Sequence, residues 1–125
     1  MPRILVVDDD PDVAEFVALV LEEDGYEVET VLSGEAALER LARGPYELIV
    51  CDLHMAGVDG RAVYEAVHRQ SPPHPPMLFV SGHQDADDYR PFLQEFSPPV
   101  LAKPFTVDAL RRTVRELLGG SRRSE

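Results

Sequence analysis

Apolar runs alternate with segments of helical periodicity along this chain. The most continuous runs are 4–7, 48–51, 77–80 and 100–102, and a less uniform segment, 28–32, is typical of an edge strand. Continuous apolar runs indicate parallel strands that are buried on both faces. Their alternation with helical patterns predicts repeated βα units, and therefore an α/β domain built on a parallel sheet.

The segments between these runs carry helix signals. The first helix has an apolar stripe at helical spacing, formed by Val13, Phe16, Val17, Val20 and Leu21. Asp10, Ser33 and Thr106 are predicted N-caps, and a third helix is expected after Asp59. The fourth helical pattern contains Pro91, which is tolerated only in a first turn. We therefore expect that helix to begin near Pro91 or to be kinked there.

Length and composition indicate one domain without a membrane span. We expect a domain over residues 1–119 and a disordered tail over 120–125. No apolar run approaches the roughly 20 residues that a transmembrane helix needs, and the start of the chain lacks the apolar region of a secretory signal. We predict a cytoplasmic location. Cys51 is the only cysteine, which excludes an internal disulfide, and we expect it to be a small core residue.

The net charge of −11, from 12 basic and 23 acidic residues, narrows the choice of partners. It argues against direct binding to nucleic acid, which needs a basic face. It suits a cation site or a basic protein partner. Arg111, Arg112 and Arg115 make the last helix basic, either as a solvated face or as a docking surface.

Polar residues whose side chains can take part in catalysis or bind a ligand follow four of the apolar runs. Asp8 and Asp9 follow the first run, Asp52 follows the run at 48–51, Ser81 follows the run at 77–80, and Lys103 follows the last run. In open α/β sheets the ligand site lies outside the carboxyl ends of the strands. These five side chains are therefore expected to meet at one edge of the sheet.

The expected cluster suits phosphoryl transfer. Neighbouring carboxylates repel one another unless a cation neutralises them, and Mg²⁺ is typically held by one or two carboxylates, waters and phosphate oxygens. Asp8 or Asp9 with Asp52 would supply such ligands, whereas Asp10 is better explained as a helix cap. Asp52 can act as a nucleophile that forms an acyl phosphate. Lys103 would neutralise the phosphoryl oxygens and Ser81 would donate a hydrogen bond to one of them.

The segments Val6–Asp10, Asp52, Val80–Ser81 and Lys103–Phe105 together resemble the receiver domains of two-component response regulators. The resemblance implies a flavodoxin-like, doubly wound parallel sheet of five strands in the order 2-1-3-4-5, flanked by five helices. It also implies that Asp52 is the phosphoacceptor and that Lys103 and Ser81 contact the phosphoryl group. The Mg²⁺ ligands would be Asp8, Asp9, Asp52 and the backbone carbonyl of His54. The Lys103–Pro104 bond is expected to be cis.

The same resemblance implies the partners and the activity. The phosphoryl donor would be a histidine kinase or a histidine phosphotransfer protein. A downstream protein target would bind the face made by the fourth helix, the last strand and the last helix. Such a domain assists its own phosphorylation and dephosphorylation and is not otherwise an enzyme.

The chain departs from the family pattern at several positions. Val100 stands where receivers usually carry Tyr or Phe, and Ala56 where the loop after the acceptor usually has proline. The irregular fourth helix is more typical of receivers attached to hybrid sensor kinases. We also hypothesise that His54 and His83, two residues beyond Asp52 and Ser81, alter acyl-phosphate lifetime with a pH dependence near the imidazole pKa of about 6.5.

Two other functions are compatible with parts of this pattern. A magnesium-dependent phosphohydrolase of the haloacid-dehalogenase type also uses aspartates after a first strand. It would need an Asp-x-Asp motif and an acidic pair after the lysine strand, whereas here Pro104 and Phe105 follow Lys103. The other is a degenerate receiver that binds partners without phosphate, which the replacement at Val100 leaves open.

Overall fold

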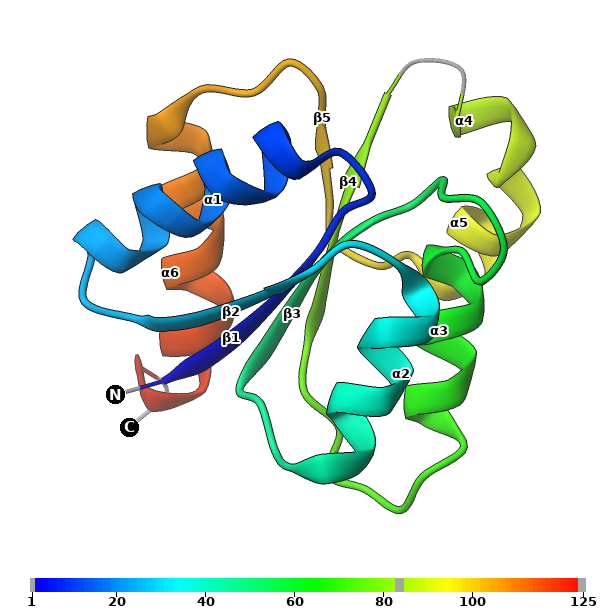
Figure 1. The fold of residues 1–125 in the computed structure, drawn as a ribbon, viewed down its shortest axis with the longest axis horizontal. Coiled ribbons are helices and arrows are strands. Elements are labelled where there is room, and N and C mark those ends of the chain that lie inside the picture. The colour runs from blue at the N-terminus through cyan, green and yellow to red at the C-terminus, as the bar shows by residue number, and fades with distance from the viewer. Residues whose placement is uncertain (1, 83–84, 124–125) are drawn as a thin grey trace.

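A parallel sheet forms the centre of the computed structural model, which describes residues 2–82 and 85–123 (Figure 1). Its five strands follow the order β2-β1-β3-β4-β5, as the resemblance implied. They are β1 (Arg3–Val7), β2 (Glu27–Val31), β3 (Leu48–Asp52), β4 (Met77–Ser81) and β5 (Val100–Ala102). The less apolar β2 lies at one edge of the sheet, as predicted.

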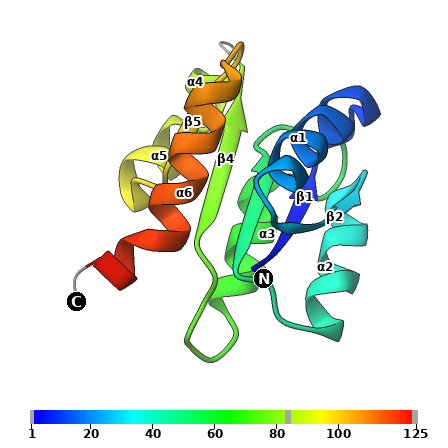
Figure 2. The same cartoon turned by 90° about the vertical axis from the view of Figure 1, so that its left-hand side faces the viewer.

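Helices cover both faces of this sheet (Figure 2). The helices α1 (Pro11–Glu23) and α6 (Val107–Arg123) lie on one face. The other face carries α2 (Gly34–Arg43), α3 (Gly60–His68) and α5 (Arg90–Phe96). Side chains alternate between the two resulting cores: Ile4 and Val6 pack with α1 and α6, whereas Leu5 and Val7 pack on the opposite side. Burial on both faces explains the continuous apolar runs.

The predicted N-caps Asp10, Ser33 and Thr106 are observed, and Asp59, which was not predicted as a cap, caps α3 in the same way. The side chains of Asp10, Ser33 and Asp59 accept hydrogen bonds from amides in the first turns of α1, α2 and α3. The Thr106 hydroxyl accepts from the Ala109 amide at 3.0 Å in α6. These caps satisfy amides that have no partner within the helix. They also fix where each helix leaves the carboxyl end of its preceding strand.

Phe16 departs from the predicted stripe of α1. It is 42% exposed, while the smaller Ala14 is buried in its place beside Val17, Val20 and Leu21. The Phe16 ring instead lies 6.3 Å from the ring of Phe105, which follows Lys103 and Pro104. The apolar stripe of α1 therefore continues onto the surface near the carboxyl end of β5.

The fourth helix is interrupted, as Pro91 predicted. A short α4 (Asp85–Asp88) ends before Tyr89, and α5 starts at Arg90 with the proline in its first turn. Proline has no amide hydrogen and its ring collides with the carbonyl four residues earlier. A continuous helix through Pro91 is thus unfavourable, and Tyr89 is left at the junction of two short helices.

The last helix extends further than we expected. We predicted a disordered tail over residues 120–125, but α6 continues to Arg123. Two glycines each weaken a helix by roughly 1 kcal/mol without removing a hydrogen-bond donor, so they disfavour continuation without forbidding it. The domain boundary at residue 119 stays a prediction. Within the described residues, no helix is long and apolar enough to cross a membrane.

Candidate functional site

The N-terminal acids lie where β1 ends and α1 begins. Asp8 is 3% exposed, and its Oδ1 accepts a hydrogen bond from the Asp10 amide at 2.9 Å. Asp9 is exposed beside it. Asp10 is instead the cap of α1, accepting from the Asp12 amide at 3.0 Å. The sequence interpretation that separated Asp10 from its two neighbours therefore agrees with the structure.

Asp52 meets these acids across the sheet. It is the last residue of β3, is 6% exposed, and belongs to the strand that pairs with β1. One carboxylate oxygen from each of Asp8, Asp9 and Asp52 lies within 4.8 Å of the others. Three carboxylates at this separation could hold a metal ion, because a hard cation is bound through oxygen ligands.

Lys103 directly follows β5, the strand on the far side of β4 from β3, and its side chain reaches the same carboxylates. Its Nζ lies 3.7 Å from Asp52 Oδ2 and 3.8 Å from Asp8 Oδ2. The Lys103 amide donates to the Ser81 carbonyl at 2.8 Å, which continues the pairing of β4 and β5. The Lys103–Pro104 bond is cis, as expected. The site thus contains one ammonium group between two buried carboxylates.

Ser81 ends β4, the strand next to the one that Asp52 ends, but its hydroxyl is directed toward the backbone of the following residue. Ser81 is buried at 6% exposure, and its hydroxyl donates to the Gly82 carbonyl at 3.1 Å. The register pairs Asp52 with Val80, one residue earlier. The hydroxyl that we expected to contact a phosphoryl group is therefore on the adjacent strand, with a backbone acceptor in this structure.

Burial dominates the electrostatics of the acidic cluster. Loss of hydration raises the pKa of the Asp8 carboxyl, and the Asp10 amide and the Lys103 ammonium offset this effect only in part. The charges of Asp9 and Asp10 raise the Asp8 pKa further. Added positive charge at this position would favour the ionised carboxylate.

Cys51 is inert in this arrangement, as the sequence predicted. Its side chain is fully buried, and loss of hydration raises the pKa of its thiol well above the ordinary value. The neighbouring charge of Asp52 acts in the same direction. A nucleophilic cysteine needs a stabilised thiolate, so the chemistry of this site belongs to the carboxylates.

The loop between β3 and α3 contains a contact that sequence reasoning missed. The Tyr89 hydroxyl donates to Asp59 Oδ2 at 2.8 Å and lies 3.4 Å from His54 Nδ1. His54 and Asp59 stood out through their positions after a strand and before a helix. Tyr89 carried only a helical spacing signal. His83, the other histidine of our hypothesis, lies outside the described residues.

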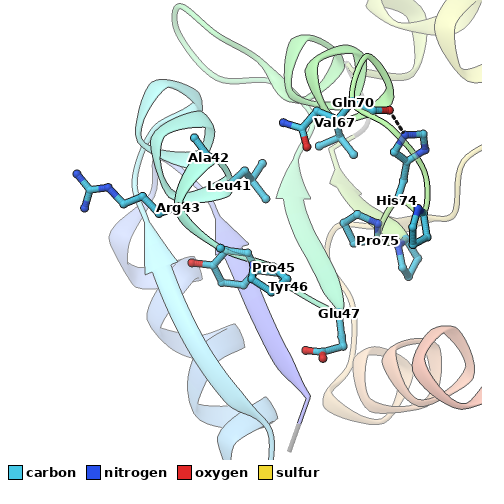
Figure 3. Close-up of a pocket in the computed structure, with 13 residues that line it drawn as sticks. Leu41, Ala42, Arg43, Pro45, Tyr46, Glu47, Val67, Gln70, His74 and Pro75 are labelled. Carbon is cyan, nitrogen blue, oxygen red and sulfur yellow. Dashed lines mark hydrogen bonds between the residues drawn. The ribbon is translucent and has the colours of Figure 1, made fainter.

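The hollow in Figure 3 is at the opposite end of the sheet from the acids. It has a volume of about 590 Å³ and lies between the ends of α2 and α3 and the segments that lead into β3 and β4. Its lining includes Leu41, Tyr46, Val67 and Pro75. His74 also lines it, with Nε2 hydrogen-bonded to the Gln70 carbonyl at 2.7 Å. The carboxylate and lysine cluster is therefore separate from this hollow.

Comparison with known families identifies the arrangement. The model of the response regulator receiver domain matches residues 4–115. The chain belongs to the response regulator receiver domain family. Receiver domains are the phosphoaccepting modules of two-component systems, and that is the function of this domain. This membership decides against the haloacid-dehalogenase alternative.

Similar receivers occur both in response regulators and in sensor kinases. The sensor histidine kinase GacS of Pseudomonas protegens is 32% identical over 99% of this chain and 14% of its own length. The chain spans about half or less of the length of the first curated relatives that it matches. Because both kinds of protein are represented, the idea that this receiver is of the hybrid sensor kinase type stays a prediction.

Solved receiver structures share the fold over nearly the whole chain. The signal receiver domain of a histidine kinase from Syntrophus aciditrophicus has a TM-score of 0.87 and 31% identity, and covers 100% of this chain and 96% of that one. The response regulator TrrA from Thermotoga maritima, solved in complex with Mg²⁺ and BeF, has a TM-score of 0.81 and 32% identity. That alignment covers 94% of this chain and 100% of TrrA.

Proposed function

We propose that Asp52 is the phosphoacceptor of this receiver domain, with a histidine kinase or a histidine phosphotransfer protein as donor. The observation that carries the proposal is the position of its carboxylate. Asp52 ends a central strand, shares a cluster with Asp8 and Asp9, and has the Lys103 ammonium 3.7 Å away. A nucleophilic oxygen, a cation site and a fixed positive charge are the components that phosphoryl transfer requires.

We assign the metal of this site as Mg²⁺, held by Asp8, Asp9 and Asp52 together with the backbone carbonyl of His54. The donor set fits, because all four groups offer hard oxygen atoms and the three carboxylates converge within 4.8 Å. TrrA, a similar receiver, was solved with Mg²⁺ and BeF bound. When bound, the ion would neutralise negative charge on the phosphoryl oxygens.

The positions of the side chains support the following transfer step. A carboxylate oxygen of Asp52 attacks the phosphorus of a phosphohistidine, the P–N bond breaks, and the imidazole leaves and takes up a proton. Lys103, which now lies between Asp8 and Asp52, pairs with a phosphoryl oxygen. The Ser81 hydroxyl exchanges its bond to the Gly82 carbonyl for one to another phosphoryl oxygen. Attack of water on phosphorus later releases phosphate and restores the carboxylate.

The domain assists these two steps and has no further catalytic role in the proposal. Its output would pass through a protein partner that binds the face of α4, α5, β5 and α6. Phe96 and Val100 expose apolar surface there, at 44% and 42%, and Arg112 and Arg115 are exposed on α6. The cytoplasmic location and the exclusion of nucleic acid remain predictions from composition.

Adduct formation tests the proposal directly. Wild-type protein with Mg²⁺ and acetyl phosphate should gain one phosphoryl mass by intact mass spectrometry, and Asp52→Asn should gain none. Asp10→Asn is the matched control, because it removes a neighbouring charge while keeping a good helix cap, and it should be phosphorylated like wild type.

Two results would contradict this assignment. A folded wild-type domain that forms no adduct with acetyl phosphate or beryllofluoride would support the degenerate receiver. An adduct that persists in Asp52→Asn would place the acceptor at another residue.

A further inference from the structure

Tyr89 links two parts of the molecule that are distant in sequence. It lies at the junction of α4 and α5, where its ring packs against the core on that face of the sheet. Its hydroxyl donates to Asp59 Oδ2 at 2.8 Å and lies 3.4 Å from His54 Nδ1. The Tyr89 and His54 rings meet edge to face, with centroids 6.3 Å apart. One phenol therefore contacts both ends of the loop that follows Asp52.

Asp59 uses its two carboxylate oxygens for different elements. Oδ1 accepts the Ala62 amide at 3.0 Å and caps α3, while Oδ2 accepts the Tyr89 hydroxyl. A hydrogen bond to an ionised carboxylate is stronger than one between neutral groups. The start of α3 and the junction of α4 and α5 are thus connected through a single side chain.

The start of α3 is also pressed against the end of β3. The Gly60 amide donates to the Leu53 carbonyl at 2.9 Å, and a Cβ on Gly60 would lie 2.7 Å from the Asp52 carbonyl oxygen. No side chain fits in that space. A displacement of the backbone at Asp52 therefore moves Asp59 and Gly60, and Asp59 is the residue that Tyr89 contacts.

We propose that Tyr89 is a positioning residue that couples the β3–α3 loop to the junction of α4 and α5. This inference rests on the proposed function, with Asp52 as the acceptor and the His54 carbonyl as a metal ligand. The hydroxyl holds the loop in the arrangement that the metal and the phosphoryl group need. In return, occupancy of Asp52 changes the position of α5 through the same contact.

The direction of the effect follows from preorganisation. A loop that is already ordered loses less conformational freedom when a ligand binds, so the Tyr89 hydroxyl should strengthen adduct formation at Asp52. Coupling between two sites is reciprocal. Loss of the hydroxyl should therefore weaken the adduct and also reduce the response of α5 to it.

Tyr89→Phe isolates the hydroxyl, because the ring that packs in the core is retained. We would titrate the full chain with beryllofluoride in the presence of Mg²⁺ and follow backbone amides by NMR. The variant should bind at least about five-fold more weakly, at the low end of typical coupling. At saturation, the amide shifts in Arg90–Phe96 should fall below about half of the wild-type values.

Tyr64→Phe is the matched control. The Tyr64 ring packs against Phe92 and stacks on His68 on the same face of the sheet, and its hydroxyl makes no hydrogen bond within residues 2–82 and 85–123. This variant should match wild type in affinity and in the shifts of α5. Equal behaviour of all three proteins would overturn the inference while leaving Asp52 as the acceptor.

A double-mutant cycle with Asp59→Asn separates a specific contact from general loosening. Asparagine preserves the cap of α3 but removes the charge that accepts the Tyr89 hydroxyl. If both residues act through one bond, the loss of affinity in the double variant is clearly smaller than the product of the two single losses. Fully multiplicative losses would contradict the coupling. Absence of beryllofluoride binding by the wild type would overturn both this inference and the proposed function.

Discussion

Asp8 combines a functional position with an unfavourable environment. Its carboxylate is buried beside Asp52, and loss of hydration raises its pKa despite the Asp10 amide and Lys103. Residues that serve a ligand often carry such a cost in the free protein. The stability of the metal-free domain should therefore depend on whether Asp8 is ionised.

We predict that Asp8→Asn stabilises the domain at neutral pH when no divalent cation is present. The folded state binds the Asp8 proton more tightly than the unfolded chain, so wild-type stability falls as pH rises from the ordinary aspartate pKa of 3.8 through the raised value. Asparagine removes this loss and can still accept the Asp10 amide. The gain should be about 0.5–2 kcal/mol at pH 7, measured by urea unfolding between pH 3 and 8.

Two comparisons make this measurement decisive. Asp12→Asn removes an exposed charge from the first turn of α1 and should not reproduce the pH-dependent gain. Added Mg²⁺ should stabilise wild type and have little effect on Asp8→Asn, because a ligand stabilises only a protein that binds it. If Asp8→Asn is less stable than wild type at pH 7 without metal, ionised Asp8 does not destabilise the folded domain and the prediction is wrong.

At the level of elements, the site depends on how closely α3 approaches β3. Gly60 begins α3 directly after its cap, and an added Cβ would lie within 3.0 Å of the Asp52 carbonyl oxygen, the Leu53 Cα and the Phe79 ring. Two of these three neighbours are backbone atoms, which cannot turn away. The absence of a side chain at Gly60 therefore sets the position of the loop that carries His54.

We predict that Gly60→Ala destabilises the domain by about 1–3 kcal/mol, the usual cost of inserting atoms into packed space. It should also weaken beryllofluoride binding, because Asp52 and Leu53 must shift. Gly119→Ala is the control, since nothing lies within 4 Å of a Cβ there, and it should stabilise α6 by up to about 1 kcal/mol. Urea unfolding of both variants checks this; an unchanged Gly60→Ala protein would disprove the close approach.

The elements also show where sequence reasoning succeeds. Asp8, Asp52, Ser81 and Lys103 were predictable because each directly follows or ends an apolar strand, and parallel strands end at one edge. The Tyr89 contact was not, since it joins residues 30 positions apart through side-chain reach, which no periodicity encodes. The exposure of Phe16 was also missed. Helical spacing shows which face of α1 a residue lies on, but it does not show whether another part of the molecule covers that residue.

For the whole molecule, the strand order came from family resemblance and the two buried faces came from the apolar runs. The extent of the domain at its carboxyl end is less determined by pattern. Among residues 107–119 of α6, Leu110 and Val114 are buried, with Leu117 and Leu118 partly buried against the same core. All of them precede Gly119, although the helix continues to Arg123.

We predict that a chain ending at residue 119 keeps the stability and the beryllofluoride affinity of the full chain. The core contacts of Leu110, Val114, Leu117 and Leu118 would remain, and hydrogen bonds at the end of a helix contribute little because such ends fray. The free energy of unfolding should change by less than about 0.5 kcal/mol, as for changes away from packed features. Urea unfolding and NMR titration of both chains measure this. A loss above roughly 1 kcal/mol would mean that residues 120–125 belong to the folded domain.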